Sequence, residues 1–281
     1  MTTPMAIRLG CFASVLLVMA AWEVVAPRRP LAAGKPLRWM SNLGLVALNV
    51  ILVRLVLPLT ALGMATIADE QGWGLLRQWA IPDWLRFALG IVALDLAIYL
   101  QHVLFHAVPA LWRLHMVHHA DLDFDVTTGV RFHTLEILLS TLIKVGVVAA
   151  MGPPVWAVLT FEVLLNASSM FNHGNVRLPP WLDRMLRLIV VTPDMHRVHH
   201  SVERHEANTN FGFTVPWWDY LLGTYRPQPA AGHDGMQIGL SHCREERKVE
   251  RLPWMIALPF LEGTGSYSIP ERDKPSSDFN A

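Results

Sequence analysis

The stretch WLRFALGIVALDLAIYLQHVLFHAVPALWRLHMVHH, residues 84–119, decides the fold because it joins a long apolar run to a cluster of histidines. The run from Trp84 to Ala107 exceeds the ~20 residues that a helix needs to cross a bilayer. His102 and His106 stand near its end in the pattern HxxxH, and residues 115–119 read HxxHH. Since residues three and four apart share one face of a helix, each pattern directs two or three imidazoles at one point.

Two further histidine groups follow in the chain. His173 stands alone, and residues 196–200 repeat the pattern HxxHH. Neutral imidazole is a ligand for first-row transition metals, and nine converging rings exceed what one ion can bind. The spacing therefore predicts two metal ions close together, with the ligands His102, His106, His115, His118, His119, His173, His196, His199 and His200.

Composition indicates that this cluster belongs to a membrane protein. Of the 281 residues, 52% are hydrophobic and 16% charged, whereas soluble domains carry roughly 25% charged residues. Further apolar segments are Leu9–Val25, Leu43–Ala65, and the pair Ile137–Met151 and Val155–Phe171, which is broken at Gly152-Pro153-Pro154. Because proline ends a helix, the pair predicts a helical hairpin. We predict an all-α integral membrane protein with about four transmembrane helical elements, the last of them this hairpin, and a cytosolic histidine-rich helical cap.

Charge and cysteine content exclude other classes of function. The formal net charge is zero, which gives no electrostatic basis for binding nucleic acid. The two cysteines, Cys11 and Cys243, are too few for a disulfide framework or a cysteine metal site. We expect a single domain over residues 1–263, with the histidine-rich region at 90–228, and a disordered polar tail at 264–281.

The distribution of Lys and Arg predicts the orientation in the membrane. Arg28, Arg29, Lys35 and Arg38 lie between the first two apolar segments, so we expect this loop in the cytoplasm and the N-terminus outside. The segment that ends at Ala107 then returns to the cytoplasm, and the hairpin begins and ends on that side. Every histidine cluster is therefore predicted at the cytoplasmic face.

Charged residues inside the apolar segments raise a separate expectation. Arg54 and Asp95 lie at matching depths, roughly 18–20 Å from the cytoplasmic end at ~1.5 Å per residue, and Glu162 comes to a similar depth. An unpaired charge at mid-bilayer costs at least ~2.5–3.5 kcal/mol on insertion scales. We therefore expect Arg54 to pair with Asp95 or with Glu162.

The motifs around the histidines resemble those of the fatty acid hydroxylase superfamily, which includes sterol desaturases, sterol methyl oxidases and sphingolipid hydroxylases. The motifs are Asp95-x3-Tyr99-x2-His102-x3-His106, Leu111-Trp112-x2-His115-x2-His118-His119, Arg131-x-His133-x2-Glu136, Asn172-His173-Gly174-Asn175, Thr192-Pro193-Asp194-Met195-His196-x2-His199-His200, and Asn210-Phe211-Gly212 with Trp218-Asp219-x3-Gly223-Thr224-Tyr225. The sequence departs from the family at Ser169, where members often carry another histidine. Either the site has one ligand fewer, or a nearby group such as His133 or Asn172 substitutes.

The resemblance implies a membrane-bound, O2-dependent oxidoreductase with two non-haem irons that hydroxylates, or desaturates, a C–H bond of a lipid such as a fatty acyl, sterol or sphingolipid-type substrate. His133 is a possible further ligand, and Asp95, Tyr99, Asn172 and Asn210 are expected to support the ligands. Electrons are expected from an external donor, a reductase with a ferredoxin or a cytochrome b5-like carrier, because the sequence has no GxGxxG motif and no cysteine quartet.

The choice of metal follows from chemistry. Zinc also binds imidazole but has no redox chemistry, and hydrolytic sites usually place a Glu base beside the ligands, as in HExxH. The clusters contain no such Glu, which favours iron and oxidation. The alternative is a non-catalytic haem- or metal-binding membrane protein, in which haem would need isolated histidines within the membrane rather than HH pairs at its edge.

Overall fold

The computed structural model describes residues 3–261, 263, 267 and 269, and this part of the chain is helical without any β-strand. Four segments are long and apolar enough to cross a membrane: Thr3–Val25, Lys35–Arg77, Asp83–Ala107 and Thr134–Met151. The predicted all-α integral membrane architecture is confirmed. The helices are α1 (Thr3–Val25), α2 (Lys35–Val56), α3 (Ala61–Gln71), η1 (Leu75–Arg77), α4 (Asp83–Ala107), α5 (Pro109–His119), η2 (Thr128–Val130), α6 (Thr134–Met151), α7 (Val155–Asn172), α8 (Pro180–Leu186), α9 (Pro193–His199), α10 (Arg204–Ala207), α11 (Trp217–Leu222), α12 (Gly232–Gly235), α13 (Glu246–Glu250) and α14 (Leu252–Leu261).

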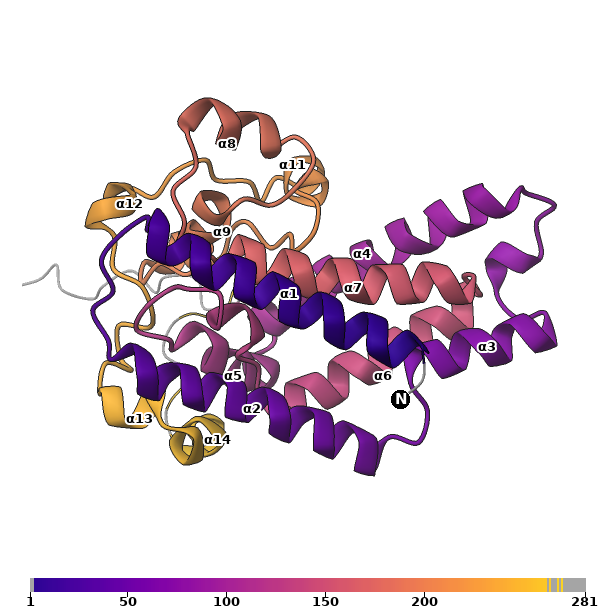
Figure 1. Ribbon diagram of the computed structural model, residues 1–281, viewed down its shortest axis with the longest axis horizontal. Helices are drawn as coiled ribbons and strands as arrows, with labels where there is room; N and C mark the ends of the chain where they lie inside the picture. Colours follow the sequence, from indigo (N-terminus) through magenta and orange to yellow (C-terminus); the bar gives the residue numbers. More distant parts are fainter. Residues whose placement is uncertain (1–2, 262, 264–266, 268, 270–281) are drawn as a thin grey trace, which may run out of the picture.

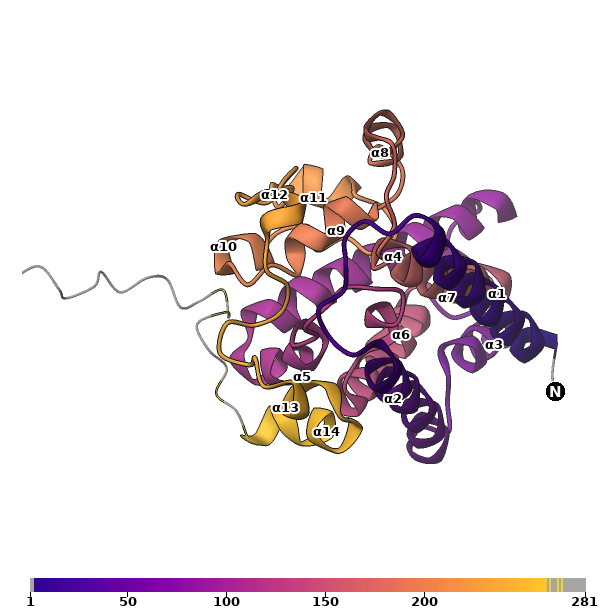
Figure 2. The same ribbon diagram turned by 60° about the vertical axis from the view of Figure 1, so that its left-hand side comes forward.

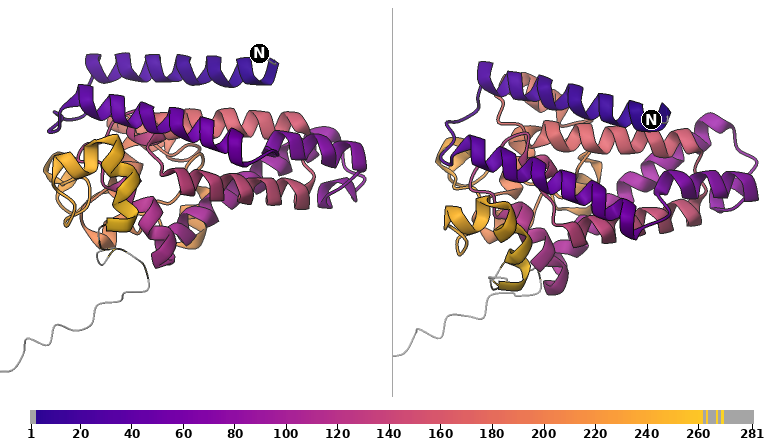
Figure 3. Two further views of the ribbon diagram at one scale, coloured as in Figure 1. Left: turned by 90° about the horizontal axis from the view of Figure 1, so that it is seen from below. Right: turned by 60° about the horizontal axis from the view of Figure 1, so that its bottom comes forward.

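The long helices lie roughly along one axis, and the short helices α8–α14 gather at one end of it (Figure 1). We call the part formed by α5 and α8–α14 the cap. The C-terminal ends of α1, α4 and α7 and the N-terminal ends of α2 and α6 meet at the cap, whereas α3 lies at the opposite end (Figures 1 and 2). Helix α1 is the outermost of the long helices (Figure 3). It packs against α7, and α2 packs against α6.

The second apolar segment is two helices, which differs from the continuous span predicted over Leu43–Ala65. Helix α2 ends at Val56, and α3 begins at Ala61 after a short extended stretch that contains Pro58. Proline cannot donate to the helical ladder and clashes with the preceding turn. Thr60 then starts α3, because its side-chain oxygen accepts from Gly63 N at 3.1 Å. Because hydropathy stays high across the break between α2 and α3, the apolar pattern alone does not reveal this break.

The end of the bundle opposite the cap is closed by a contact between two glycines. Gly152 has φ 63° and stands between α6 and α7, and Gly74 has φ 103° and precedes η1. A Cβ atom on Gly74 would lie 2.2 Å from Gly152 N, so the two backbones touch directly. Only glycine combines a positive φ with this close approach at low cost.

Buried ion pairs attach the cap to the long helices. Arg38, near the start of α2, donates to Asp121 at 2.9 Å and also to Asp125, and Arg131 donates to Glu250 of α13 at 2.8 Å. The side chains of these five residues are at most 1% exposed. Because charges this deep need partners, the loop after α5 is fixed between α2 and α13.

Arg54 makes no ion pair with Asp95 or Glu162 among the ion pairs of the described residues, so the expected pairing is wrong. Glu162 instead accepts from Arg8 of α1 at 2.7 Å, and Asp95 accepts from Trp218 Nε1 at 2.8 Å. The depth estimate rested on residue counting, which cannot give the direction in which each side chain faces.

Two residues of the predicted disordered tail are described, and one of them is packed in the core. Tyr267 is 3% exposed, stacks on Trp112 at 5.8 Å and donates to Val202 O at 2.6 Å. Ile269 N donates to His106 O at 3.1 Å. Tyr267 and Ile269 thus have defined contacts, the remainder of residues 264–281 lies outside the described residues, and the disorder of the tail stays a prediction.

Candidate metal centre

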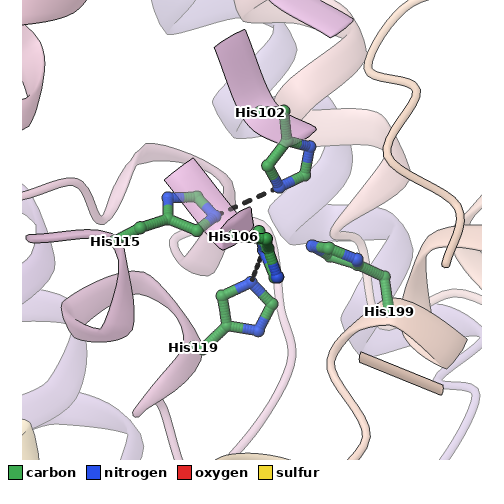
Figure 4. Close-up of side chains that lie close together, drawn as sticks. All are labelled: His102, His106, His115, His119 and His199. Carbon is green, nitrogen blue, oxygen red and sulfur yellow. Dashed lines mark hydrogen bonds between the residues drawn. The ribbon is translucent and has the colours of Figure 1, made fainter. Parts of the chain in front are cut away.

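All nine histidines of the sequence patterns meet in the cap end of the bundle, in two groups. His102, His106, His115, His119 and His199 form the first group, which Figure 4 shows converging from different elements on one point. His118, His173, His196 and His200 form the second group. In each group one nitrogen from every ring lies within 4.8 Å of the others, and all nine side chains are buried.

Each HxxHH pattern supplies both groups, and this division explains its spacing. On α5, His115 and His119 are four residues apart and belong to the first group, whereas His118 belongs to the second. On α9 the relation is reversed: His196 and His200 join the second group, and His199 joins the first. Residues four apart share a helix face, so both segments lie between the two groups, which must be adjacent.

In five of the nine rings the outward nitrogen faces a hydrogen-bond acceptor. His102, His173 and His199 each place Nδ1 at 2.7 Å from a backbone carbonyl, of Phe211, Ser169 and Thr209 respectively. A carbonyl only accepts, so Nδ1 carries the proton and Nε2 is left as a lone pair. His115 Nδ1 lies 2.7 Å from Glu136 Oε1, and His106 Nδ1 lies 3.1 Å from Asn208 Oδ1. Metal-bound histidines are oriented by partners of this kind.

The inward nitrogens of neighbouring rings lie close to one another. The Nε2 atoms of His102 and His115 lie 3.1 Å apart, and those of His106 and His119 lie 3.2 Å apart (Figure 4). In the second group, His173 Nε2 lies 3.1 Å from the Nε2 atoms of both His118 and His200. Ligands bound at ~2.0–2.1 Å from one ion have edges of roughly 3.0–3.4 Å. The observed separations therefore fit a metal ion at the centre of each group.

Buried nitrogens without partners support the same conclusion. Among the described residues, His199 Nε2 and both ring nitrogens of His196 are buried and lack a hydrogen-bond partner. An unpaired buried polar atom costs free energy, and a metal ion would satisfy it. The donor set is imidazole throughout, so the residues fit two ions of the first transition row.

Burial keeps these imidazoles neutral. It lowers the pKa of His115 and of His173 to about 3. Burial, together with the neighbouring histidines, also holds the pKa values of His118, His119, His196, His199 and His200 well below the usual value. Metal binding requires neutral imidazole, so no proton competes for these nitrogens at neutral pH.

The four residues expected to support the ligands hydrogen-bond neighbouring residues and not the ligand rings. Tyr99 hydrogen-bonds Thr224 at 2.8 Å, and Thr224 donates to Asp219. Asp219 accepts from the backbone N–H groups of Phe211 and Gly212, and so fixes the carbonyl that orients His102. Burial raises the pKa of Asp219 to about 6.

The other three, Asp95, Asn172 and Asn210, also form hydrogen bonds that hold segments near the ligands in place. Asp95 accepts from Trp218, and Asn172 Nδ2 donates to Phe213 O at 2.8 Å. Asn210 has φ 52° and donates to the carbonyls of Met195 and Arg226. Among the described residues outside the two groups, the side chains that hydrogen-bond a ligand ring are those of Glu136 and Asn208. Glu136 is part of the Arg131-x-His133-x2-Glu136 motif, but no local pattern identified Asn208.

His133 lies outside both groups. It starts α6, where its Nδ1 accepts from Leu135 N at 3.2 Å and its Nε2 faces Ile256 O at 3.2 Å. Ser169, which replaces the family's additional histidine, donates to Gly129 O at 2.6 Å, and its own carbonyl accepts from His173 Nδ1. The second group therefore contains four histidines and the first contains five.

A cavity of about 430 Å³ adjoins the first group. His102, His115 and Glu136 line its inner end, and residues of α1, α2, α4, α6 and α7 form its walls. The walls are largely apolar, with Phe12, Val50 and Leu165 among them. A cavity of this size between apolar helices is typical of a binding site for a small hydrophobic ligand.

Fold and site together define an integral membrane protein with two adjacent all-histidine groups that can hold metal. The family model for fatty acid hydroxylases matches residues 87–224, which contain all nine histidines. Over residues 87–224 the chain belongs to the fatty acid hydroxylase superfamily, as its motifs indicated.

Known relatives are lipid-oxidising enzymes by name. The chain is 32% identical over 163 residues to the ornithine lipid hydroxylase OlsE of Rhizobium tropici, which covers 57% of this chain and 47% of the relative. It is 30% identical to human alkylglycerol monooxygenase, over 58% of this chain and 34% of that protein. It is 29% identical to mouse cholesterol 25-hydroxylase, over 50% of this chain and 46% of that protein. The chain thus matches less than half the length of these relatives, and no solved structure matches it.

Proposed function

We propose that this protein is a membrane-bound, O2-dependent non-haem di-iron oxidoreductase that hydroxylates a C–H bond of a lipid. The observation that carries the proposal is the pair of adjacent all-histidine groups beside an apolar cavity. The relatives named above support lipid hydroxylation as the reaction, and desaturation of the same bond is the second outcome that this site chemistry allows.

In this proposal the first iron is held by His102, His106, His115, His119 and His199, and the second by His118, His173, His196 and His200. Iron in this environment supplies the activation of O2 that oxidation of an unactivated C–H bond requires. Zinc would fit the same nitrogens but offers no redox chemistry. Up to five rings around one point leave no open plane for a porphyrin, which counts against the haem alternative.

The protein's own residues orient the ligands, position the lipid and manage protons. Backbone carbonyls hold the Nδ1 protons of His102, His173 and His199, so each Nε2 faces its ion. Glu136 fixes His115 through Oε1, whereas its Oε2 is buried without a partner and the residue lines the cavity. This second oxygen is placed to hold a proton between the metal centre and the lipid.

Electrons would come from an external donor, a reductase with a ferredoxin or a cytochrome b5-like carrier, that reaches the cap from the cytoplasm. The positive charges between α1 and α2 support this orientation, because short loops rich in Lys and Arg remain on the cytoplasmic side. We also propose that residues 1–263 act as one domain, since residues from α2, from the segment after α5 and from α13 form buried ion pairs with one another.

The test is metal analysis combined with turnover. Protein purified anaerobically should contain two irons per chain and show no Soret band. With O2 and a reducing system it should add one oxygen atom to a lipid in a membrane extract, measured by mass spectrometry. His118→Ala and His199→Ala, one from each group, should abolish turnover while membrane insertion persists. A Soret band, or full activity in either variant, would refute the proposal.

A further inference from the structure

The cavity has a charged end as well as a metal end. Along α6 its lining residues include Glu136, Ser140 and Lys144, which lie four residues apart and so share one face. Glu136 touches His115 of the first group. Lys144 stands eight residues farther along α6, which is roughly 12 Å at ~1.5 Å per residue. Arg54 of α2 and Arg8 of α1 also line the cavity.

The positive charges at this end exceed the negative ones. Arg8 is neutralised by Glu162 at 2.7 Å. Glu136 is the acidic residue of the lining and is engaged with His115 at the opposite end. Arg54 and Lys144 form no ion pair among the ion pairs found within residues 3–261, and no hydrogen bond to a described residue is found for either side chain. Two cations therefore face the cavity without a counter-charge from the described chain.

These two cations lie within segments long and apolar enough to span the membrane, Lys35–Arg77 and Thr134–Met151. Lys144 lies ten residues after the start of α6, whereas Arg54 lies in the last turn of α2. A charged side chain within a membrane segment costs free energy, and such residues usually mark a substrate or ion pathway. A neutral lipid in the cavity would leave this cost uncompensated. An anionic group beside both residues would offset it, because opposite charges attract strongly at low dielectric.

We propose that the cavity binds a single-chain amphiphile whose carboxylate or phosphate group lies at Arg54 and Lys144 and whose apolar chain extends towards His102 and His115. The walls between the two ends include Leu9, Phe12, Val46 and Val53, which suit a hydrocarbon chain. Oxidation of the hydrocarbon chain at the metal end rests on the proposed function. Recognition of the anionic group by Arg54 and Lys144 is independent of the proposed function. The position oxidised would be set by the distance between the anionic group and the metal end, and Lys144 and Glu136 are separated by about 12 Å along α6.

The experiment measures binding without turnover. The metal-loaded protein is placed in phosphatidylcholine nanodiscs without O2 or an electron donor, and radiolabelled palmitate is displaced by competitors, with empty nanodiscs subtracted. The competitors are palmitate, hexadecyl phosphate, the uncharged hexadecanol, and inorganic phosphate. The two anionic amphiphiles should bind at least ~10-fold more tightly than hexadecanol, and inorganic phosphate should not compete at equal concentration, because the chain contributes most of the burial.

Matched variants separate charge from folding. Arg54→Met with Lys144→Met should reduce the preference for the anion to less than ~3-fold while hexadecanol binding is retained, since Met keeps the apolar stem. Arg54→Met combined with Lys144→Glu leaves one negative charge at this end and should favour hexadecylamine, added as a further competitor, over palmitate, which shows a folded cavity of altered charge. Lys35→Met, on α2 but outside the cavity lining, should leave the preference intact.

The inference would be overturned if the wild-type protein bound palmitate and hexadecanol with equal affinity, or if the double variant kept the preference for the anion. It would also be overturned if inorganic phosphate, which has no hydrocarbon chain, displaced the radiolabelled palmitate. None of these results depends on oxidation. A protein that binds the anionic amphiphile with the expected preference and oxidises no lipid would refute the proposed function and leave this inference standing.

Discussion

Glu136 offers the sharpest test of the metal assignment because it touches one ligand of one group. Its Oε1 lies 2.7 Å from His115 Nδ1, and the side chain is 4% exposed. His115 belongs to the first group only. Replacing Glu136 should therefore weaken the ion in the first group and leave the ion in the second group bound. Glu136→Gln keeps an acceptor without the charge, whereas Glu136→Leu removes both.

The expected magnitude follows from the strength of this hydrogen bond. A hydrogen bond to a charged group contributes about 1.5–3 kcal/mol, which corresponds to a roughly 10- to 150-fold change in a binding constant at ~1.4 kcal/mol per tenfold. Loss of a partner to a metal-bound histidine typically costs 10- to 100-fold in metal affinity. We expect about 10-fold weaker binding of one iron in Glu136→Gln and about 100-fold in Glu136→Leu.

The assay is an anaerobic titration with Fe(II) in competition with a chromophoric chelator, which counts the ions and gives an affinity for each. Gln101→Leu is the matched control, because Gln101 lines the same cavity but donates to Ser140 rather than to a ligand. Two irons bound with wild-type affinity in Glu136→Leu would refute the role of Glu136. Equal weakening of both ions would refute the division of the histidines into two groups.

Three further predictions concern the fold around the centre. Arg38→Met leaves Asp121 and Asp125 buried without their main partner and should cost about 3–5 kcal/mol of stability, measured by thermal unfolding in detergent against Lys35→Met; an unchanged Tm would contradict it. Gly74→Ala should lower the free energy of unfolding by at least about 1–2 kcal/mol, because its Cβ would lie 2.2 Å from Gly152 N. The control is Gly10→Ala, whose Cβ would meet no atom within 4 Å. Equal Tm values for the two variants would contradict the close contact between Gly74 and Gly152. A reporter fused after residue 262 should be cytoplasmic and one inserted at Gly72 extracytoplasmic, and the reverse pattern would refute the orientation.

The sequence was sufficient to predict the helical membrane architecture and the convergence of the histidines, because both depend on local periodicity. Apolar runs of membrane-spanning length are recognisable without tertiary structure, and spacings of three and four place rings on one helix face. The division of those rings between two groups was not predictable. It depends on how α5 and α9 are rotated about their axes, which the packing of α4, α7 and the loops determines.

The residues that hold the rings in place were harder to predict for the same reason. Glu136 meets His115 across 21 residues of sequence and Asn208 meets His106 across 102, so no local pattern links them. Tyr99 and Asp95 share a helix face with His102, yet they act through Thr224 and Trp218 of a distant segment. Depth in the membrane follows from residue counting, but the direction of a side chain does not, which is why Glu162 pairs with Arg8 rather than Arg54.

The two groups are physically dependent on each other. In His102, His173 and His199 the Nδ1 proton is donated to a backbone carbonyl. Nε2 of each ring therefore carries a lone pair that faces the centre of its group. The Nε2 atoms of facing rings lie 3.1–3.2 Å apart, and burial lowers the pKa values of His115 and His173 to about 3, so these two imidazoles are neutral at neutral pH. A cation at the centre of each group would bind several of these nitrogens at once and so stabilise the arrangement. Because α5 and the segment at 196–200 each supply ligands to both groups, binding of one ion orients the helix that carries ligands for the other. We therefore expect partial coupling: a variant that weakens the ion in the first group, such as Glu136→Leu, should lower the affinity for the second ion by a smaller factor than for the first.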